Sequence, residues 1–415
     1  MMGMIRLLQR LLLIVFSSCL ILVGLELAFR WVQWHQLSQL EREDDPVYHH
    51  RLKSHWTFHQ SSPDFHTVAT TNNLGLRGSR DYHEKAPGTR RLLMLGDSFT
   101  FGVGVNDDET FCILLQQTLN HQHAGMEVIN AGIGSYSPLL HYLALRDLYL
   151  PLSPDAVILW FDFGDLQDDF HYERNLRYDA SGRIIACNPH YFHGQFDWYD
   201  ALKERSAMMK YFHNKFLRTY QKIRILGVRR YLGILIRRER AKAAIAKLQG
   251  RAREKVEALD YGQLLMIRDR ANLPEIERHW QRTGKYILMI RDLLKQRHIP
   301  FALAAYPYGV QVGPDQWGKG REAFGFQPGV TYSDPFPFEF LARFAKDNDI
   351  PFIDTHESFL AAAETTRLYH DWDGHFTAAG QRVVAQHLVH DPVFWAFLTH
   401  SGFPVTVPSA APRRQ

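Results

Sequence analysis

Short apolar runs recur along the chain, each next to a segment with helical periodicity. The runs predict buried strands at 91–95, 127–129, 156–161, 300–305 and 351–354. Helical patterns cover 110–120, 138–149, 281–297, 338–347 and 378–389. Continuous apolar strands that alternate with helices are typical of a parallel sheet covered on both faces. The pattern therefore predicts an α/β fold, namely a three-layer α/β/α sandwich around a parallel five-stranded sheet.

The alternation stops between residues 166 and 279. Because such a stretch is too long for a loop inside a compact domain, we expect an inserted, largely helical subdomain. Its segment 215–255 holds fourteen Lys or Arg residues and two acids, a net charge of +12 in a chain of net charge +4. Three interpretations stay open: a helical lid with a solvated basic face, an interfacial helix on anionic lipid, or a wall for an anionic polysaccharide.

The N-terminus predicts a membrane anchor. The run 11–25 is uncharged and follows Arg6 and Arg10. With its flanks it gives about 19 residues, or roughly 28 Å of helix, close to the ~30 Å of a hydrocarbon core. A cleaved signal peptide is the alternative, but no A-x-A cleavage site is present. We expect an uncleaved signal anchor that contacts membrane lipid through residues 7–32, with a cytoplasmic N-terminus and an exported remainder.

These patterns divide the chain into five parts. They are a cytoplasmic tip with its anchor (1–33), a juxtamembrane lead-in (34–90), a split sheet domain (91–165 with 280–395), an insertion (166–279) and a C-terminal tail (396–415). An apolar content of 46% and a charged content of 22% are ordinary for a globular protein and exclude a disordered one. Three cysteines are too few for disulfides to hold a fold of this size together. Cys112 and Cys187 could pair in an exported protein, but we expect both to be buried free thiols. The small net charge argues against a nucleic-acid partner.

Candidate catalytic residues lie at both ends of the predicted sheet domain. Ser98 follows the first strand, where a serine on a tight strand-to-helix turn is exposed beside backbone N–H groups that can face an oxyanion. The alternative is that Asp97 and Ser98 only cap the next helix. Before the last helix, His375 is a candidate general base for Ser98, and Asp373 or Asp371 is a candidate to orient its imidazole.

Together these blocks resemble the SGNH (GDSL) hydrolases. Residues 96–100 are similar to the first block of that family, and 130–137 to the second, whose oxyanion glycine is best matched by Gly134. The segment 373–375 resembles the last block, in the Asp-x-His form of the alginate and cell-wall O-acetyltransferase branch. The segment 73–78 resembles the lead-in of membrane-anchored bacterial members. The resemblance covers about 70–165 and 280–395.

The third block of this chain departs from the family pattern. In the family, this block has an Asn that donates to the oxyanion, followed by Asp, whereas this chain has Gly164 and Asp165. Losing one such donor costs about 10²–10³ in rate. Three outcomes are open: another donor such as Gln167 substitutes, two backbone donors suffice, or the site binds without turnover. The predicted site is then as follows: Ser98, Asp373 and His375 catalytic; Ser98, Gly134 and Gly164 in the oxyanion hole; Asp97, Asp165 and Asp371 in support.

The resemblance implies a serine esterase that acts on ester-linked acyl groups of an exported glycan or a small ester, without a cofactor. The alternatives are an O-acyltransferase (acetyltransferase) with the same site, or a catalytically degenerate scaffold of a membrane assembly. We expect no metal, because His356, Glu357, His370 and His375 match no ligand spacing. The implied location is the bacterial inner membrane, single-pass, with a periplasmic catalytic domain and polysaccharide-processing proteins of that membrane as candidate partners.

Overall fold

The computed structural model divides into two compact units, 1–43 with 190–246 and 44–189 with 247–415. We call the second unit the sheet domain. The residues that the structure describes are 9–10, 13, 16–18, 20–27, 42–189, 206, 208–209, 264–268, 273–324 and 326–405. Parts of the predicted anchor, including residues 28–32, and all of the basic segment 215–255 lie outside them. Across the described ranges, no helix combines the length and the apolar character required to cross a bilayer.

The sheet domain is built on five parallel strands, as the sequence predicts. Their order across the sheet places β5 next to both β6 and β7. Every residue of β6, β7 and β10 is buried, which explains the continuously apolar sequences of β7 and β10. The strands, in their order across the sheet, are β11 (Phe352–Asp354), β10 (Phe301–Ala305), β7 (Ala156–Phe161), β5 (Arg90–Gly96) and β6 (Met126–Gly132).

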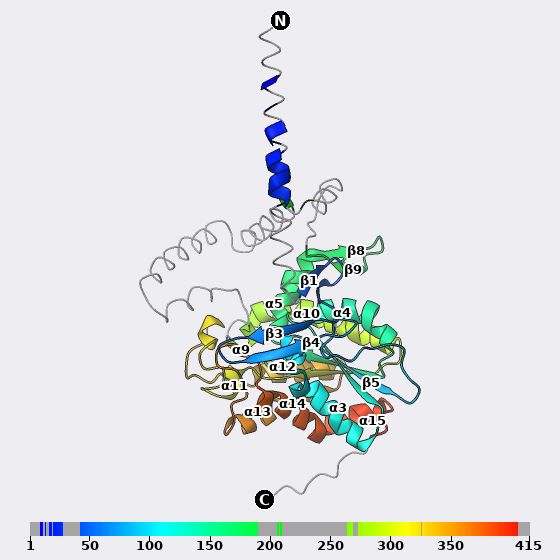
Figure 1. The fold of residues 1–415 in the computed structure, drawn as a ribbon. Coiled ribbons are helices and arrows are strands. Elements are labelled where there is room, and N and C mark those ends of the chain that lie inside the picture. The colour runs from blue at the N-terminus through cyan, green and yellow to red at the C-terminus, as the bar shows by residue number, and fades with distance from the viewer. Residues whose placement is uncertain are drawn as a thin grey trace, which may run out of the picture. The chain divides into compact units, whose positions relative to one another are not determined.

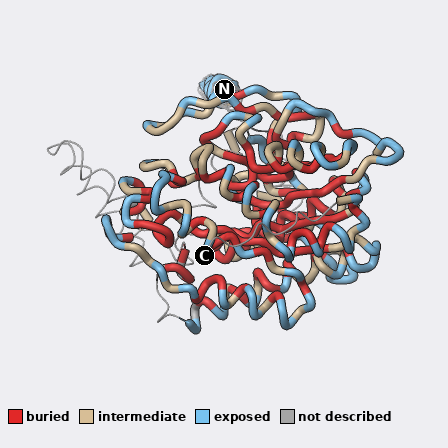
Figure 2. The backbone as a smooth tube through the Cα atoms, turned by 90° about the horizontal axis from the view of Figure 1, so that it is seen from below, coloured by how far each residue is buried: buried red, intermediate tan, exposed pale blue. Residues whose placement is uncertain are grey.

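Helices cover both faces of this sheet, so the layers are those of an α/β/α sandwich (Figure 1). Buried residues fill the middle of the domain between the layers (Figure 2). One group of helices consists of α3 (Phe111–Gln122), α13 (His356–Ala363), α14 (Ala378–His390) and α15 (Pro392–His400). The other consists of α4 (Pro138–Ala144), α5 (Asp165–Tyr172) and α10 (Leu273–Lys295), while α12 (Phe336–Asp347) packs against β11 at the sheet edge.

The predicted tail, residues 396–415, begins inside a helix that the sequence analysis missed. α15 starts directly after α14 because Asp391 caps it, accepting a hydrogen bond from the Val393 N–H, with Pro392 in the first turn. Phe394 and Phe397 of this helix are buried against the core. The prediction of a tail from residue 396 is therefore wrong for the described residues 396–405.

The predicted lead-in, residues 34–90, is folded onto the sheet domain from residue 44 onward. It contains short strands with exposed or partly exposed positions, most of them polar, which is why no continuous apolar run marks them. The strands are β1 (Arg42–Asp45), β2 (His49–Leu52), β3 (Thr57–Ser61) and β4 (His66–Thr70). Core side chains from this segment are Tyr48, Leu52, Phe58, Ala69, Leu76 and Tyr82.

The predicted insertion, residues 166–279, also starts too early. Its first residues form α5 and a hairpin that belong to the sheet domain, and its last residues belong to α10. The hairpin consists of β8 (Leu176–Tyr178) and β9 (Ile184–Cys187), and its last residue Cys187 is a buried free thiol like Cys112. Residues 190–246 belong to the first unit, so the sheet domain is interrupted from residue 190 onward.

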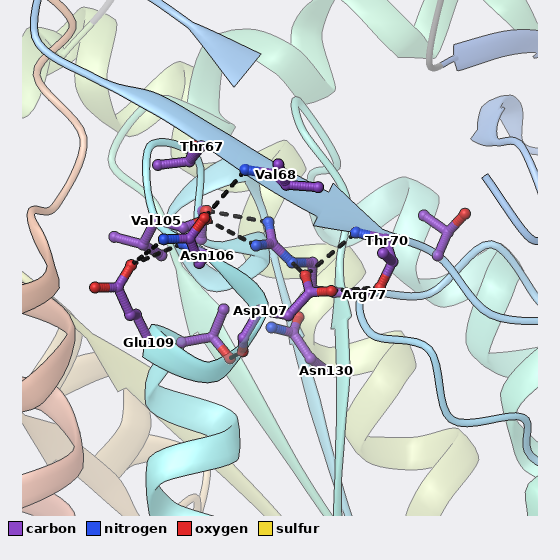
Figure 3. A network of polar contacts seen from close by, with 12 residues as sticks. Thr67, Val68, Thr70, Arg77, Val105, Asn106, Asp107, Glu109 and Asn130 are labelled. Carbon is purple, nitrogen blue, oxygen red and sulfur yellow. Dashed lines mark hydrogen bonds and ion pairs between the residues drawn. The ribbon is translucent and has the colours of Figure 1, made fainter. Parts of the chain in front are cut away.

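A buried arginine of the lead-in, Arg77, is hydrogen-bonded to the loop that follows β5 and α2 (Ser98–Phe101), as Figure 3 shows. The Arg77 Nε donates to Asp107 Oδ1 at 2.5 Å, and its terminal nitrogens donate to the carbonyls of Val105 at 2.8 Å and Gly102 at 3.2 Å. Thr70 of β4 donates to Asp107 through both its N–H, at 3.2 Å, and its hydroxyl. These bonds satisfy a desolvated guanidinium and hold the loop after α2 in place.

Candidate active site

The candidate nucleophile Ser98 is the first residue of α2, at the carboxyl end of β5. Asp97 caps this helix, because its Oδ1 accepts the Phe99 N–H at 2.9 Å. A Cβ on Gly96 would lie 2.1 Å from Thr100 Oγ1, so the strand can turn into the helix only with glycine there. The helix cap formed by Asp97 and the partial exposure of Ser98 are thus two consequences of one turn rather than alternatives.

The structure brings together three residues that are far apart in the sequence. His375 Nε2 lies 2.7 Å from Ser98 Oγ, and His375 Nδ1 is hydrogen-bonded to Asp373 Oδ1. Since an ionised carboxylate can only accept, Nδ1 carries the proton and Nε2 is left to accept from the Ser98 hydroxyl. Burial alone would raise the pKa of Asp373, but its hydrogen bond and charge interaction with His375 outweigh burial and lower it. This arrangement can remove a proton from the serine.

Asp97 is a second neighbour of the Ser98 hydroxyl. Its Oδ2 lies 3.2 Å from Ser98 Oγ, which is longer than the 2.7 Å to His375 Nε2. A hydroxyl has one proton to donate, and the shorter contact favours the imidazole. The other oxygen of Asp97 accepts from Tyr306 Oη at 2.7 Å, in addition to the helix-capping bond. Asp97 therefore supports the turn that carries the serine.

Two backbone N–H groups next to the serine are available to bind an oxyanion. A Cβ on Gly134 would lie 3.8 Å from Ser98 Cβ, so the turn after β6 approaches the nucleophile closely. Within the described ranges, neither the Ser98 N–H nor the Gly134 N–H has a hydrogen-bond partner. Donors of this kind stabilise the charge that develops on a carbonyl oxygen during acyl transfer.

Gly164, the third predicted member of the oxyanion hole, is already engaged. Its N–H donates to Asp162 Oδ1 at 2.6 Å, and it has no side chain to replace that donor. Gln167 is not a free substitute donor for the oxyanion, because its Nε2 contacts His171 Nε2 at 3.3 Å. The structure therefore does not offer Gly164 as a donor, and it leaves the two N–H groups of Ser98 and Gly134.

Buried carboxyl groups lie beneath this site, at the end of β7. Tyr308 Oη lies 2.6 Å and 2.7 Å from the two oxygens of Asp162, and Tyr306 Oη lies 3.4 Å from one of them. Burial, and then the nearby charge of Asp97, raise the pKa of Asp162 well above its ordinary value. Asp165 accepts the Asp162 N–H at 3.1 Å, and burial raises its pKa as well. The sequence signal for this cluster is only that its members follow strand ends.

The structure separates the two candidate acids of the histidine. Asp373 contacts His375, whereas the Asp371 carboxylate accepts from the Gly318 N–H at 3.2 Å and pairs with Lys319 at 3.2 Å and Arg367 at 2.7 Å. Asp371 therefore ties the loop before the histidine to the segment 318–320. Its support of the site is indirect.

The residues considered for a metal have other contacts. His356 stacks on Phe338 at a ring distance of 4.5 Å, and His370 Nε2 lies 3.2 Å from the Gly104 carbonyl oxygen. His375 is hydrogen-bonded to Ser98 and Asp373. In the part of the chain that the structure describes, no three His, Cys, Asp or Glu side chains are grouped so as to hold a metal ion.

Two residues of the lead-in contact the site, and the sequence analysis missed both. Asp64 Oδ2, in the turn between β3 and β4, accepts the N–H groups of Trp372 at 2.6 Å and Asp373 at 3.1 Å. His50 of β2 contacts the Gly134 carbonyl oxygen at 2.9 Å. Nothing in the local sequence marks these side chains, because their partners lie 84 to 309 residues away.

Comparison with known proteins shows only remote likeness. No protein-family model and no curated protein matches the chain. Among solved structures, the acetylxylan esterase Axe2 from Geobacillus stearothermophilus is 13% identical, with 77% of this chain and 97% of that chain covered and a TM-score of 0.33. The acetyl xylan esterase AlAXEase is 17% identical, with 72% and 97% covered and a TM-score of 0.33.

A third similar structure is BT4096, a gut microbial diltiazem-metabolizing enzyme. It is 12% identical, with 78% of this chain and 49% of that chain covered and a TM-score of 0.36. Likenesses at this level do not identify a family, so the function must be argued from the geometry of the site.

Proposed function

We propose that this protein is a serine esterase that hydrolyses ester-linked acyl groups. The observation that carries the proposal is the 2.7 Å contact between Ser98 Oγ and His375 Nε2, with the opposite ring nitrogen bonded to Asp373. A nucleophile, a base within hydrogen-bond reach and a group that orients the base are what acyl transfer through a serine requires. Among the residues that the structure describes, the N–H groups of Ser98 and Gly134 have no hydrogen-bond partner, and both lie beside the carbon atom that carries the nucleophile oxygen.

The first half of the reaction forms an acyl-enzyme. Ser98 Oγ attacks the ester carbonyl carbon while His375 Nε2 takes the hydroxyl proton, and Asp373 stabilises the imidazolium that results. The carbonyl oxygen becomes an oxyanion that the N–H groups of Ser98 and Gly134 hold. When the intermediate collapses, the carbon–oxygen bond to the alcohol breaks, and His375 returns the proton to the departing alkoxide.

The second half releases the acyl group. A water molecule attacks the acyl carbon of the modified Ser98 while His375 Nε2 takes its proton. Collapse of the second intermediate breaks the bond to Ser98 Oγ, which recovers the proton from the histidine. The products are a carboxylic acid and the free enzyme.

The finer parts of the proposal are a glycan substrate and a membrane location. Trp372, which is 38% exposed and precedes Asp373, supports an acylated carbohydrate, because it offers a sugar ring an aromatic face. Residues 20–27 are helical and expose their large apolar side chains, which supports lipid contact. With the uncharged run 11–25, this supports an anchor at the bacterial inner membrane and an exported sheet domain.

The test is labelling of the full-length protein with a fluorophosphonate probe, together with hydrolysis of 4-nitrophenyl acetate. We expect Ser98→Ala and His375→Ala to lose labelling and to lower kcat by about 10⁴-fold or more. Ser54→Ala, at an exposed position of the lead-in, is the matched control and should behave as the wild type.

A folded wild-type protein that neither reacts with the probe nor hydrolyses the ester would overturn the proposal in favour of a binding or scaffold role. Labelled protein that transfers acetyl to a sugar hydroxyl faster than to water would instead make it an O-acyltransferase. Product analysis by mass spectrometry with added xylo-oligosaccharide separates these two outcomes.

A further inference from the structure

In the turn 133–136, which carries the Gly134 N–H, each of the first three carbonyl groups accepts a hydrogen bond. The Ile133 carbonyl accepts the Tyr136 N–H at 2.9 Å. The Gly134 carbonyl contacts His50 Nε2 at 2.9 Å, and the Ser135 carbonyl accepts from Tyr172 Oη at 2.7 Å. Two of the three bonds thus come from side chains outside the turn, in β2 and α5.

The turn needs this support because its backbone is strained. Ser135 has a φ of 65°, in the left-handed region that a residue with a Cβ seldom adopts. Such a conformation is unfavourable for a residue with a Cβ and persists only where the surroundings impose it. The bonds at the Gly134 and Ser135 carbonyls flank this residue on both sides.

The tautomer of His50 follows from its partners. A carbonyl oxygen can only accept, so His50 Nε2 carries a proton and donates it to Gly134. In the neutral ring His50 Nδ1 is then an acceptor, and it lies 3.0 Å from His49 Nδ1, which must donate. Tyr136 packs edge-on against the His50 ring at 5.1 Å and donates its hydroxyl to the His50 carbonyl at 2.7 Å. His50 is only 7% exposed, so water cannot easily replace it as the donor.

We propose that His50 is a positioning residue of this active site: its Nε2–H holds the Gly134 carbonyl so that the Gly134 N–H faces the oxyanion beside Ser98. The inference rests on the proposed esterase function. It makes a strand of the predicted lead-in part of the catalytic machinery, although His50 touches no reacting atom. The strand becomes an element on which the rate of the chemical step depends.

The experiment compares His50→Leu with His50→Gln, using kinetics with 4-nitrophenyl acetate and the rate of fluorophosphonate labelling. Leu keeps much of the volume of the ring but has no donor, whereas the Gln amide nitrogen reaches about as far as Nε2 and can donate. Because an oxyanion contact forms only in the transition state, we expect His50→Leu to lower kcat about tenfold with KM within about twofold. We expect His50→Gln to restore most of that loss. His59→Gln, at an exposed position of β3, is the matched control.

Equal kcat values for folded His50→Leu and wild type would overturn the inference, and so would a loss that appears in KM alone or that Gln fails to restore. If His50→Leu does not fold, Tyr172→Phe removes the bond at the Ser135 carbonyl and should lower kcat in the same way. An inactive, unlabelled wild type would instead reject the esterase proposal itself, so the two failures are distinguishable.

Discussion

In the sequence resemblance to the SGNH hydrolases, Gly164 takes the place of an oxyanion-donating Asn, so Gly164→Asn is the substitution that most directly probes the departure. The structure predicts that it will not restore a donor. A Cβ at this position would lie 2.7 Å from Asp162 Oδ1, well inside ordinary van der Waals contact. That oxygen is held by the Gly164 N–H and by Tyr308 Oη, each at 2.6 Å, and it belongs to a short, buried side chain. The new side chain must therefore displace a fixed carboxyl group.

The expected cost follows from these contacts. Overpacking of a filled site costs about 1–3 kcal/mol. Moving the carboxyl group away from its donors adds about 1–3 kcal/mol for the groups left unsatisfied. We expect Gly164→Asn to lower the free energy of unfolding by about 2–6 kcal/mol and to leave kcat unchanged or lower. In the double variant with Asp162→Ala the clash is gone, so the combined loss of stability should be at least about 1 kcal/mol smaller than the sum of the single losses.

Urea unfolding followed by tryptophan fluorescence measures the stability, and hydrolysis of 4-nitrophenyl acetate measures kcat. A Gly164→Asn protein that is as stable as the wild type would show that the Asp162 oxygen is not fixed. A simultaneous gain in kcat would refute the view that two backbone donors suffice. Purely additive losses in the double variant would show that the two positions do not compete for the same space.

Two further predictions concern stability. Arg77→Met should cost about 3 kcal/mol in urea unfolding, because it leaves the Asp107 carboxylate and two carbonyls without their buried donor. Arg382→Met, on the exposed side of α14, should cost less than about 0.5 kcal/mol, and equal costs would contradict the argument. Burial raises the pKa of Asp169 to about 7, so the folded protein keeps a proton that the unfolded chain releases near pH 4. Stability should therefore fall as the pH rises from about 4 to about 7, and Asp169→Asn should reduce that slope by up to about 1.4 kcal/mol per pH unit. An unchanged slope in urea titrations at pH 5 and pH 7 would mean that Asp169 is ionised in the fold.

Four of the five strands of the sheet were predictable because they are buried on both faces. The apolar run 156–161 coincides with β7, and 300–305 differs from β10 by one residue. The lead-in strands were missed, since a strand such as β3 exposes every second side chain and leaves Phe58 as its one buried apolar residue. α15 was missed because it follows α14 with a single residue, Asp391, between them.

For the site, local sequence determined the two blocks that carry the serine and the histidine with its acid, because turn, cap and glycine requirements are local. Local sequence also placed Gly134 in the second block. Only the tertiary structure decided which acid meets His375, since Asp371 and Asp373 are both within reach in sequence but only Asp373 faces the ring. The hydrogen bond from the Gly164 N–H to Asp162 and the hydrogen bond from His50 to the Gly134 carbonyl also depend on the tertiary structure. The physical reason is that a hydrogen bond depends on where two groups lie in space. His50 and Gly134 are 84 residues apart, so the local sequence around either residue does not indicate their contact.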